Sequence, residues 1–385
     1  MTMDSPIPFR DLAVPGVRDL QPYQPGKPEA ELAREYGVTD IVKLASNENP
    51  LGPSPAAVEA VGRVAADLHR YPEGGAHDLR AAVAAHHGVV PEQLTFGNGS
   101  NDVLDLVARA FLGPGREAVF AEHAFAVYPI ATRTVGADAV VAPAHGPDHA
   151  QPHGHDLEAM LAAITGSTRV VFIANPNNPT GTWLDGDALE SFLERVPREV
   201  VVVLDEAYVD YALDCPGYLD GTRWLERFPN LVITRTFSKI HGLAGLRVGY
   251  ALSCPEIADL LNRARHPFNV NAAAQAAAVA ALADTEHVRR SVALNREQRA
   301  HLSERLAALG LRVLPSAGNF LCVEVGEGTD AVNEALLRAG VIVRPVGGYG
   351  LPRFLRVTVG TVAENERFLA ALEGARSDGL VERTA

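Results

Sequence analysis

Short runs of β-branched and other apolar residues recur between about residues 40 and 270, and each run is followed by a turn cluster and a helical pattern. Strands that are apolar on both faces and alternate with helices are typical of a mostly parallel sheet between two helix layers. The pattern therefore predicts an α/β fold. The expected strands are 118–121, 140–141, 170–174, 200–204, 231–235 and 247–252.

The pattern changes near residue 270, where an alanine-rich helical stretch begins at Asn271. A long amphipathic pattern then runs from Val288 to Leu309 and ends at Gly310, and we expect this helix to join two domains. Beyond it, strands and helices follow one another in an order typical of a small α+β domain. The strands expected there are 311–314, 320–325, 341–346 and 355–359, and the helices are 330–339 and one from Val362.

These patterns divide the chain into three parts. Residues 1–40, rich in proline and glycine, are expected to form an N-terminal arm and part of the small domain. Residues 41–275 would form the large domain, and residues 276–385 the C-terminal small domain.

Charge and cysteine content exclude several classes of protein. The chain has 34 basic and 47 acidic residues and a net charge of -13, whereas nucleic-acid binding requires clustered Lys and Arg. The three cysteines, Cys215, Cys254 and Cys322, have no CxxC spacing and no accompanying histidine cluster. We therefore expect no nucleic-acid partner, no metal site and no disulfide framework.

We expect no segment to enter a membrane. The longest near-apolar run, 276–283, is far shorter than the ~20 residues that a membrane span requires. The first residues, MTMDSPIPFRDLAVPG, contain acidic residues and prolines where a signal peptide would have a basic start and an apolar core. A cytoplasmic location is the simplest expectation.

Polar or glycine-rich residues follow several of the expected strands, where open α/β sheets bind their ligands. The first such segment is FGNGSND at 96–102. Its glycines let the backbone approach a ligand, and the start of the following helix offers unpaired N–H groups to an anion such as phosphate. A plain strand-to-helix turn capped by Asn101 would explain the same residues.

Two further segments follow the strands expected at 170–174 and 200–204. NPNNPTG at 175–181 presents two amides on a stiffened loop, which suits hydrogen bonding to a ring substituent, although a rigid turn would use the same residues. Asp205 emerges from a wholly apolar strand, and a buried carboxylate is costly unless a cation pairs with it. Either a neighbouring Arg or a bound cationic ring would meet that need.

Two more segments carry cations on or beside apolar strands. In TRTFSKIHGLAGLR at 234–247, partial burial and the charge of Arg247 would lower the pKa of Lys239, and a neutral amine is what forms an imine. Arg356 lies in LRVTVG at 355–360. It is either a surface charge on an edge strand or a planar bidentate group for a substrate carboxylate.

In this order and spacing, GNGSND, NPNNPTG, DEAY and TFSKIHGLAGLRVGY resemble the fold-type I pyridoxal-phosphate aminotransferases, over essentially the whole chain. YQPGK at 23–27, KLASNENPLG at 43–52, RYP at 70–72 and the closing LRVTVG are similar to the histidinol-phosphate aminotransferase branch. The resemblance implies a large, mostly parallel seven-stranded sheet domain, a small α+β domain and pyridoxal 5′-phosphate as cofactor.

The resemblance also implies roles for individual residues. Lys239 would bond to the cofactor and carry the proton, Asp205 would pair with the ring nitrogen, and Tyr208 would complete the catalytic set with a hydrogen bond to the ring oxygen. Phe125 would stack on the ring without the hydroxyl that family members often have there. The implied cofactor-binding residues are Gly99, Ser100, Asn101, Phe125, Asn178, Asp205, Tyr208, Thr236, Ser238, Lys239, Arg247 and, from the neighbouring subunit, Tyr71.

For the substrate, the resemblance places Tyr23, Asn47 and Arg356 around the pocket, in a homodimer with shared active sites. Arg356 would accept a phosphate in one half-reaction and a carboxylate of glutamate in the other, since a guanidinium suits both anions. The role of His241, which stands where an aromatic ring is commoner in the family, stays open.

The leading hypothesis is an aminotransferase that uses histidinol phosphate and 2-oxoglutarate and yields imidazole acetol phosphate and glutamate. A close alternative has the same chemistry with phenylalanine or tyrosine, and the sequence does not discriminate between them. A third is a phosphothreonine-type decarboxylase on the same fold, which would need no keto-acid acceptor. A non-catalytic regulator fits least, because a chain with a charge of -13 lacks a basic DNA-binding module.

Overall fold

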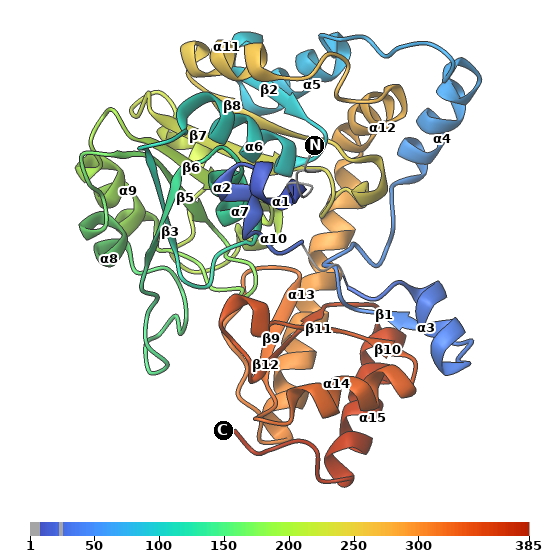
Figure 1. Cartoon of the computed structure of the whole chain (residues 1–385). Coiled ribbons are helices and arrows are strands. Elements are labelled where there is room, and N and C mark those ends of the chain that lie inside the picture. Colours follow the sequence, from blue (N-terminus) through green and yellow to red (C-terminus); the bar gives the residue numbers. More distant parts are fainter. Residues whose placement is uncertain (1–7, 23–25, 385) are drawn as a thin grey trace, which may run out of the picture.

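The computed structural model describes residues 8–22 and 26–384. Its centre is a seven-stranded sheet in the order β2-β8-β7-β6-β5-β3-β4 (Figure 1). Strands β7, β6, β5, β3 and β4 run parallel, and β8 is antiparallel to both β7 and β2, which confirms the mostly parallel sheet. The strands are β2 (Leu94–Gly97), β3 (Glu117–Ala121), β4 (Asp138–Ala142), β5 (Thr168–Ala174), β6 (Val201–Asp205), β7 (Leu231–Thr236) and β8 (Gly249–Ser253).

The central strands are buried on both faces, as their uninterrupted apolar runs predict. Successive side chains of a strand point to opposite faces, so Val170 and Phe172 of β5 face one helix layer while Val171 and Ile173 face the other. One layer contains α4 (Pro55–Val64), α5 (His77–His87), α8 (Leu157–Ala162), α9 (Gly186–Arg195) and α12 (Ala272–Ala283). The other contains α6 (Ser100–Phe111), α7 (Val127–Thr134) and α11 (Pro255–Ala264).

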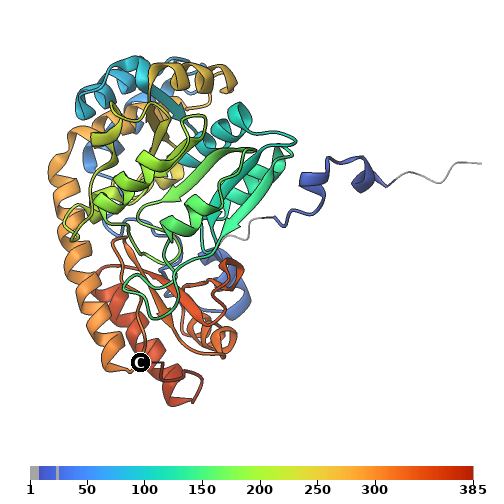
Figure 2. The ribbon, with the colours of Figure 1, turned by 90° about the vertical axis from the view of Figure 1, so that its left-hand side faces the viewer.

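A 24-residue helix, α13 (Thr285–Ala308), leads from the large sheet to the C-terminal part of the chain (Figure 2). It begins three residues before the expected start because the Asp284 side chain accepts a hydrogen bond from the His287 amide and caps the first turn. It ends where Gly310 adopts a φ of 74°, a conformation that favours glycine. At about 1.5 Å per residue the helix is long enough to span both parts.

The C-terminal part holds a three-stranded antiparallel sheet in the order β11-β12-β9, with its own apolar core. Strand 311–314 was expected there, but it forms only an isolated bridge between Val313 and Val323. The strand expected at 341–346 is divided, because β10 pairs with β1 while β11 pairs with β12. The elements are β9 (Phe320–Glu324), α14 (Thr329–Arg338), β10 (Val341–Ile342), β11 (Arg344–Pro345), β12 (Phe354–Thr358) and α15 (Val362–Ser377).

Part of the N-terminal region also lies against the C-terminal elements. Leu32 of α3 (Glu29–Tyr36) is buried beside Leu337 and Ile342, and β1 (Val42–Lys43) pairs in parallel with β10. The short helices α1 (Phe9–Leu12) and α2 (Pro15–Arg18) project from the body on the side of α7 (Figure 2). The domain limits 1–40, 41–275 and 276–385 remain our proposal. Within the described residues, no helix is long and apolar enough to cross a membrane.

Candidate active site

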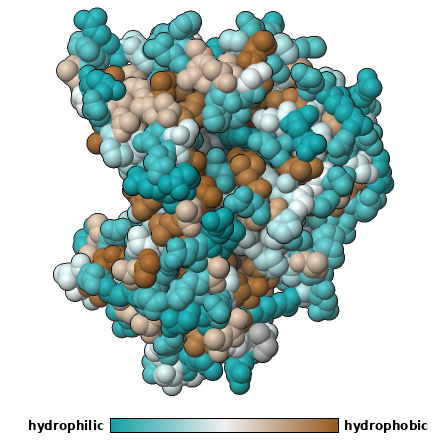
Figure 3. Space-filling model, turned by 180° about the vertical axis from the view of Figure 1, so that it is seen from behind, coloured by the Kyte–Doolittle hydropathy of each residue, from teal (hydrophilic) through white to brown (hydrophobic). Residues whose placement is uncertain are grey.

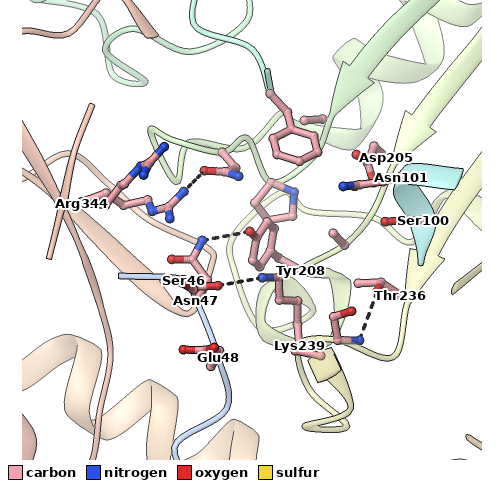
Figure 4. Close-up of a pocket in the computed structure, with 18 of the residues that line it drawn as sticks. Ser46, Asn47, Glu48, Ser100, Asn101, Asp205, Tyr208, Thr236, Lys239 and Arg344 are labelled. Carbon is pink, nitrogen blue, oxygen red and sulfur yellow. Dashed lines mark hydrogen bonds between the residues drawn. The ribbon is translucent and has the colours of Figure 1, made fainter. Parts of the chain in front are cut away.

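A cavity of about 250 Å³ lies at the carboxyl ends of β5, β6 and β7, where the large sheet meets the C-terminal part. It brings together most of the residues that the sequence predicted. In Figure 4, Arg344 lies on one side of the cavity and Ser100 and Asp205 on the other, with Lys239 and Tyr208 between them. The predicted residues that line it are Asn47, Ser100, Asn101, Phe125, Asn178, Asp205, Tyr208, Thr236, Ser238, Lys239, Arg247 and Arg356.

Lys239 follows β7 and points its amine into the cavity. Its Nζ donates a hydrogen bond of 3.0 Å to the carbonyl oxygen of Ser46 and lies 5.7 Å from the centre of the Tyr208 ring. Burial, with the positive charges of Arg356 and Arg247, lowers the pKa of Lys239 from 10.5 to about 7. A large fraction of this amine is therefore neutral near pH 7 and can act as a nucleophile or a base.

Asp205 ends β6 and is 5% exposed. Its two carboxylate oxygens accept hydrogen bonds of 2.9 Å from the hydroxyls of Tyr128 and Thr234. Burial raises the pKa of Asp205, and these two hydrogen bonds act against that rise. The sequence left two possible partners for this buried carboxylate, a neighbouring Arg or a bound cationic ring. The nearby Arg235 does not pair with Asp205, because it forms its ion pairs with Glu206 and Asp220.

A candidate anion site lies where α6 begins. Ser100 and Asn101 begin this helix, where backbone N–H groups lack the acceptor that a preceding turn would supply. Beside them, Ser238 accepts a 3.3 Å hydrogen bond from Arg247. A Cβ on Gly99 would lie 2.4 Å from Nη2 of Arg247, and one on Gly249 would lie 2.4 Å from the Ser100 amide. The two glycines therefore permit the close approach that gathers a guanidinium, hydroxyls and a helix N-terminus around one point.

Two arginines of the C-terminal part face this site across the cavity. Arg356 of β12 is 5% exposed and donates to Oδ1 of Asn178 and, over 2.7 Å, to the carbonyl oxygen of Ala45. Its Nε has no hydrogen-bond partner among the described residues. Arg344 of β11 is the register partner of Arg356 and also lines the cavity. The sequence interpretation missed Arg344, although a charge inside the apolar run 341–346 was a signal for it.

Asn47 holds the hydroxyl of Tyr208 in place. Its side-chain Nδ2 donates a 2.9 Å hydrogen bond to the Tyr208 hydroxyl oxygen, and its backbone N–H donates to the hydroxyl oxygen of Thr358. Asn47 has a φ of 56°, an unusual value for a residue other than glycine. Strained backbone of this kind is common at binding sites.

Three residues singled out from the sequence do not line the cavity. Tyr71 is 83% exposed and stacks on Phe268 at 4.8 Å between ring centres. His241 lies against Phe237, and its Nδ1 has no hydrogen-bond partner among the described residues. Gly99 precedes Ser100 in the chain, and its lack of a Cβ leaves room for the guanidinium of Arg247. A fourth, Tyr23, lies outside the described residues.

Comparison with known proteins agrees with this geometry. The family described as aminotransferase class I and II matches residues 39–372, and the chain belongs to it. Histidinol-phosphate aminotransferase 2 of Pseudomonas aeruginosa is 58% identical, covering 94% of this chain and 97% of the relative. The protein of the same name from Methylococcus capsulatus is 57% identical over 94% of this chain and 97% of its own.

A solved structure shares the fold. It is the histidinol-phosphate aminotransferase of Sinorhizobium meliloti in complex with pyridoxal 5′-phosphate, with a TM-score of 0.86 and 30% identity over 95% of this chain and 98% of that chain. The fold-type I architecture expected from the sequence is thus confirmed.

The residues of the cavity fit pyridoxal 5′-phosphate. The glycine-lined approach of Arg247 to the start of α6 suits a phosphate, and the amine of Lys239 suits an aldehyde. The buried carboxylate of Asp205, which accepts hydrogen bonds from two hydroxyls and from the Ala207 backbone, suits a ring nitrogen that carries a proton.

Proposed function

We propose that this protein is a pyridoxal-phosphate-dependent aminotransferase that interconverts histidinol phosphate plus 2-oxoglutarate with imidazole acetol phosphate plus glutamate. The observation that carries the proposal is the cavity itself, in which a low-pKa Lys239 lies between Asp205 and two arginines. The names of relatives at 57–58% identity support the choice of substrate.

We assign the cofactor to the side of the cavity formed by the large sheet. The phosphate would be held by the N-terminus of α6 at Ser100 and Asn101, by Ser238 and by Arg247, with Thr236 beside them. The bound cofactor supplies an aldehyde that reacts with amines and a ring that withdraws electrons from the carbon next to the bonded nitrogen.

The remaining side chains on this side are assigned to the ring. Phe125 would cover one face of it, and Asn178 and Tyr208 would donate hydrogen bonds to its oxygen. Asp205 would hold the proton on the ring nitrogen.

Lys239 is proposed as the base and acid of the reaction. Its amine is buried, its pKa lies near 7, and its hydrogen bond to Ser46 is to a neutral carbonyl. A group with a pKa near the working pH can take up and release a proton with little loss in either direction. The neutral amine would remove the proton from the substrate's α-carbon and would deliver it to the C4′ carbon of the cofactor in the same half-reaction, and the second half-reaction would move a proton in the opposite direction.

The arginines of the C-terminal part are proposed to bind the substrate's anionic end. Arg356 is buried beside the cavity, and its planar group suits both a phosphate and a carboxylate, so donor and acceptor can use the same residue. Arg344 adds a second positive charge at this end of the cavity. Asn47 and Tyr23 remain proposed as substrate-binding residues, and phenylalanine or tyrosine remains the alternative donor.

The proposed assembly is a homodimer in which Tyr71 enters the partner's active site. On one chain Tyr71 is exposed next to Phe268, and an open apolar groove lies between α4 and the loop after Lys239. Seen from behind, the molecule has apolar side chains exposed around a hollow (Figure 3). A two-fold contact over such a surface would make each site from two chains.

A half-reaction panel tests the proposed function. The cofactor-loaded protein would be mixed separately with glutamate, histidinol phosphate, phenylalanine and phosphothreonine while the cofactor absorbance is followed. We expect fast conversion to the amine form with glutamate and histidinol phosphate, and slower conversion with phenylalanine. Release of carbon dioxide from phosphothreonine without a keto-acid acceptor would contradict the proposal in favour of a decarboxylase.

A further inference from the structure

Asp205 is held by two hydroxyl groups that come from different parts of the large sheet domain. Tyr128 lies in the first turn of α7, and its hydroxyl donates to Oδ2 of Asp205 over 2.9 Å. Thr234 of β7 donates to Oδ1 over 2.9 Å. Both side chains are fully buried, so water does not compete for these hydrogen bonds. We call Tyr128 and Thr234 the hydroxyl clamp.

The ring of Tyr128 also supports the residue proposed to cover the cofactor. It stacks on Phe172 of β5, with 4.9 Å between ring centres and 6° between planes. It meets Phe125 edge to face, at 6.0 Å and 89°. One side chain therefore contacts both Asp205 and Phe125, which the proposed function places at the nitrogen and on the face of the same ring.

We propose that the hydroxyl clamp positions Asp205 for the cofactor's ring nitrogen and keeps its carboxylate ionised in an apolar surrounding. The inference rests on the proposed function, because it takes Asp205 as the partner of that nitrogen.

The chemistry of the donors supports it. Burial alone favours the protonated carboxyl, which could not hold a proton on the ring, whereas hydroxyl donors stabilise the anion. Tyr128 is held against Phe172 by stacking, and it contacts both Phe125 and Asp205. This packing fixes the position of Phe125 relative to Asp205. Tyr128 and Thr234 are thus positioning residues that act through Asp205, and neither lines the cavity.

The alternative is that the tyrosine hydroxyl only satisfies a buried polar group and stabilises the fold. Tyr250 is a matched case, since it is also buried in the large domain, and its hydroxyl is hydrogen-bonded to His87 over 2.8 Å. Removing either hydroxyl should cost a similar amount of stability. Of these two losses, only that of the Tyr128 hydroxyl should change the protonation of the cofactor's ring nitrogen.

The test compares Tyr128→Phe, Thr234→Val, Asp205→Asn and the control Tyr250→Phe in the full-length protein. Each would be loaded with cofactor that carries ¹⁵N in its ring, and the ¹⁵N chemical shift would report whether that nitrogen is protonated. Denaturant unfolding of the cofactor-free proteins would report stability. We expect the signal to move toward that of an unprotonated pyridine in Tyr128→Phe and Thr234→Val, and further in Asp205→Asn.

In the clamp variants, kcat should fall by about tenfold or more, with a smaller change in KM, because a hydrogen bond to a charged group is lost. Tyr250→Phe should lose stability and keep the wild-type ¹⁵N signal. If both clamp variants keep that signal and the wild-type kcat while Asp205→Asn loses them, the clamp is only structural and our inference is wrong. If Asp205→Asn also keeps the signal, the role proposed for Asp205 itself fails. Thr234→Val provides the test by itself if Tyr128→Phe does not fold.

Discussion

The amine of Lys239 donates a 3.0 Å hydrogen bond to the carbonyl oxygen of Ser46. This hydrogen bond joins the loop after β7 of the large sheet to the segment that follows β1. The acceptor is neutral, so the amine has no need to stay charged to keep this contact. Together with burial and two nearby guanidinium groups, this explains how a large fraction of a lysine amine can be neutral near pH 7.

Replacing this amine should abolish turnover without unfolding the protein. Lys239→Ala removes the group that reacts with the cofactor aldehyde, and no other lysine of the described residues lines the cavity. We expect no detectable transamination and a far-ultraviolet circular dichroism spectrum like that of the wild type. Lys27→Ala is the matched control, because Lys27 pairs with Glu31 at the surface and should be dispensable. Substantial turnover by Lys239→Ala would remove Lys239 from its proposed role.

The low pKa of Lys239 should make the stability of the cofactor-free protein depend on pH. The amine has a pKa of about 7 in the folded state and about 10.5 in the unfolded chain, so the unfolded chain binds more protons between these values. Relative to Lys239→Met, the free energy of unfolding of the wild type should therefore rise with pH from about 7 to 10.5. The slope should reach at most about 1.4 kcal/mol per pH unit, and it should vanish below pH 7. Urea titrations across this range would measure it, and a flat difference would contradict the lowered pKa.

The glycine before α6 should matter for the cofactor phosphate and not only for the backbone. Gly99→Ala places a Cβ 2.4 Å from Arg247 in a residue with a φ of 85°, whereas Gly115 has a φ of 77° and open space around it. Both variants should lose stability through backbone strain. Only Gly99→Ala should weaken cofactor binding, by about tenfold or more, because it displaces a guanidinium from the anion site. Equal cofactor dissociation constants for the two variants would contradict the assigned phosphate site.

The planar group of Arg356 should be needed for both substrates. Arg356→Lys keeps the positive charge but loses the two-pronged contact, so kcat/KM for glutamate and for histidinol phosphate should each fall by about tenfold or more. Arg353→Lys is the control, because Arg353 pairs with Glu324 outside the cavity. Dephosphorylated histidinol should be a poor donor for the wild type. A higher kcat/KM for phenylalanine than for histidinol phosphate would favour the aromatic alternative.

The shared-site proposal can be tested by mixing two impaired parents. Tyr71→Phe and Lys239→Ala subunits would form heterodimers in which one site carries both changes and the other carries neither. We expect Tyr71→Phe alone to have low activity, and mixing with Lys239→Ala to restore part of it. Absence of recovery, with heterodimers demonstrated by differently tagged subunits, would place Tyr71 outside the partner's site.

The sequence predicts the large sheet well because its central strands are apolar on both faces and end in polar residues. Val202 and Leu204 face one helix layer while Val201 and Val203 face the other, and the chain then turns polar at Asp205. Such signals are local. The strand predicted at 311–314 was wrong because an apolar pattern reports burial and not strand pairing. Its apolar residues are buried in the core, but they form only an isolated bridge.

The parts of the site that could not be predicted depend on contacts between distant segments. Tyr128 is 77 residues from Asp205 in the chain, and it stands in an ordinary helical pattern that gives no sign of a polar partner. The charge of Arg344 inside the apolar run 341–346 marked the residue, but its place beside Arg356 depends on the register between β11 and β12. Motif residues that follow strands can be assigned from sequence, whereas the groups that orient them require the tertiary structure.

The central claim is that this cavity holds the cofactor and that Lys239 is the amine bonded to it. The chain has only three lysines, Lys27, Lys43 and Lys239, so one experiment can distinguish them. Borohydride reduction of the cofactor-loaded protein, followed by proteolysis and mass spectrometry, would show which lysine carries the cofactor. The account predicts one modified peptide that contains Lys239. Modification of Lys27 or Lys43 in its place would contradict it.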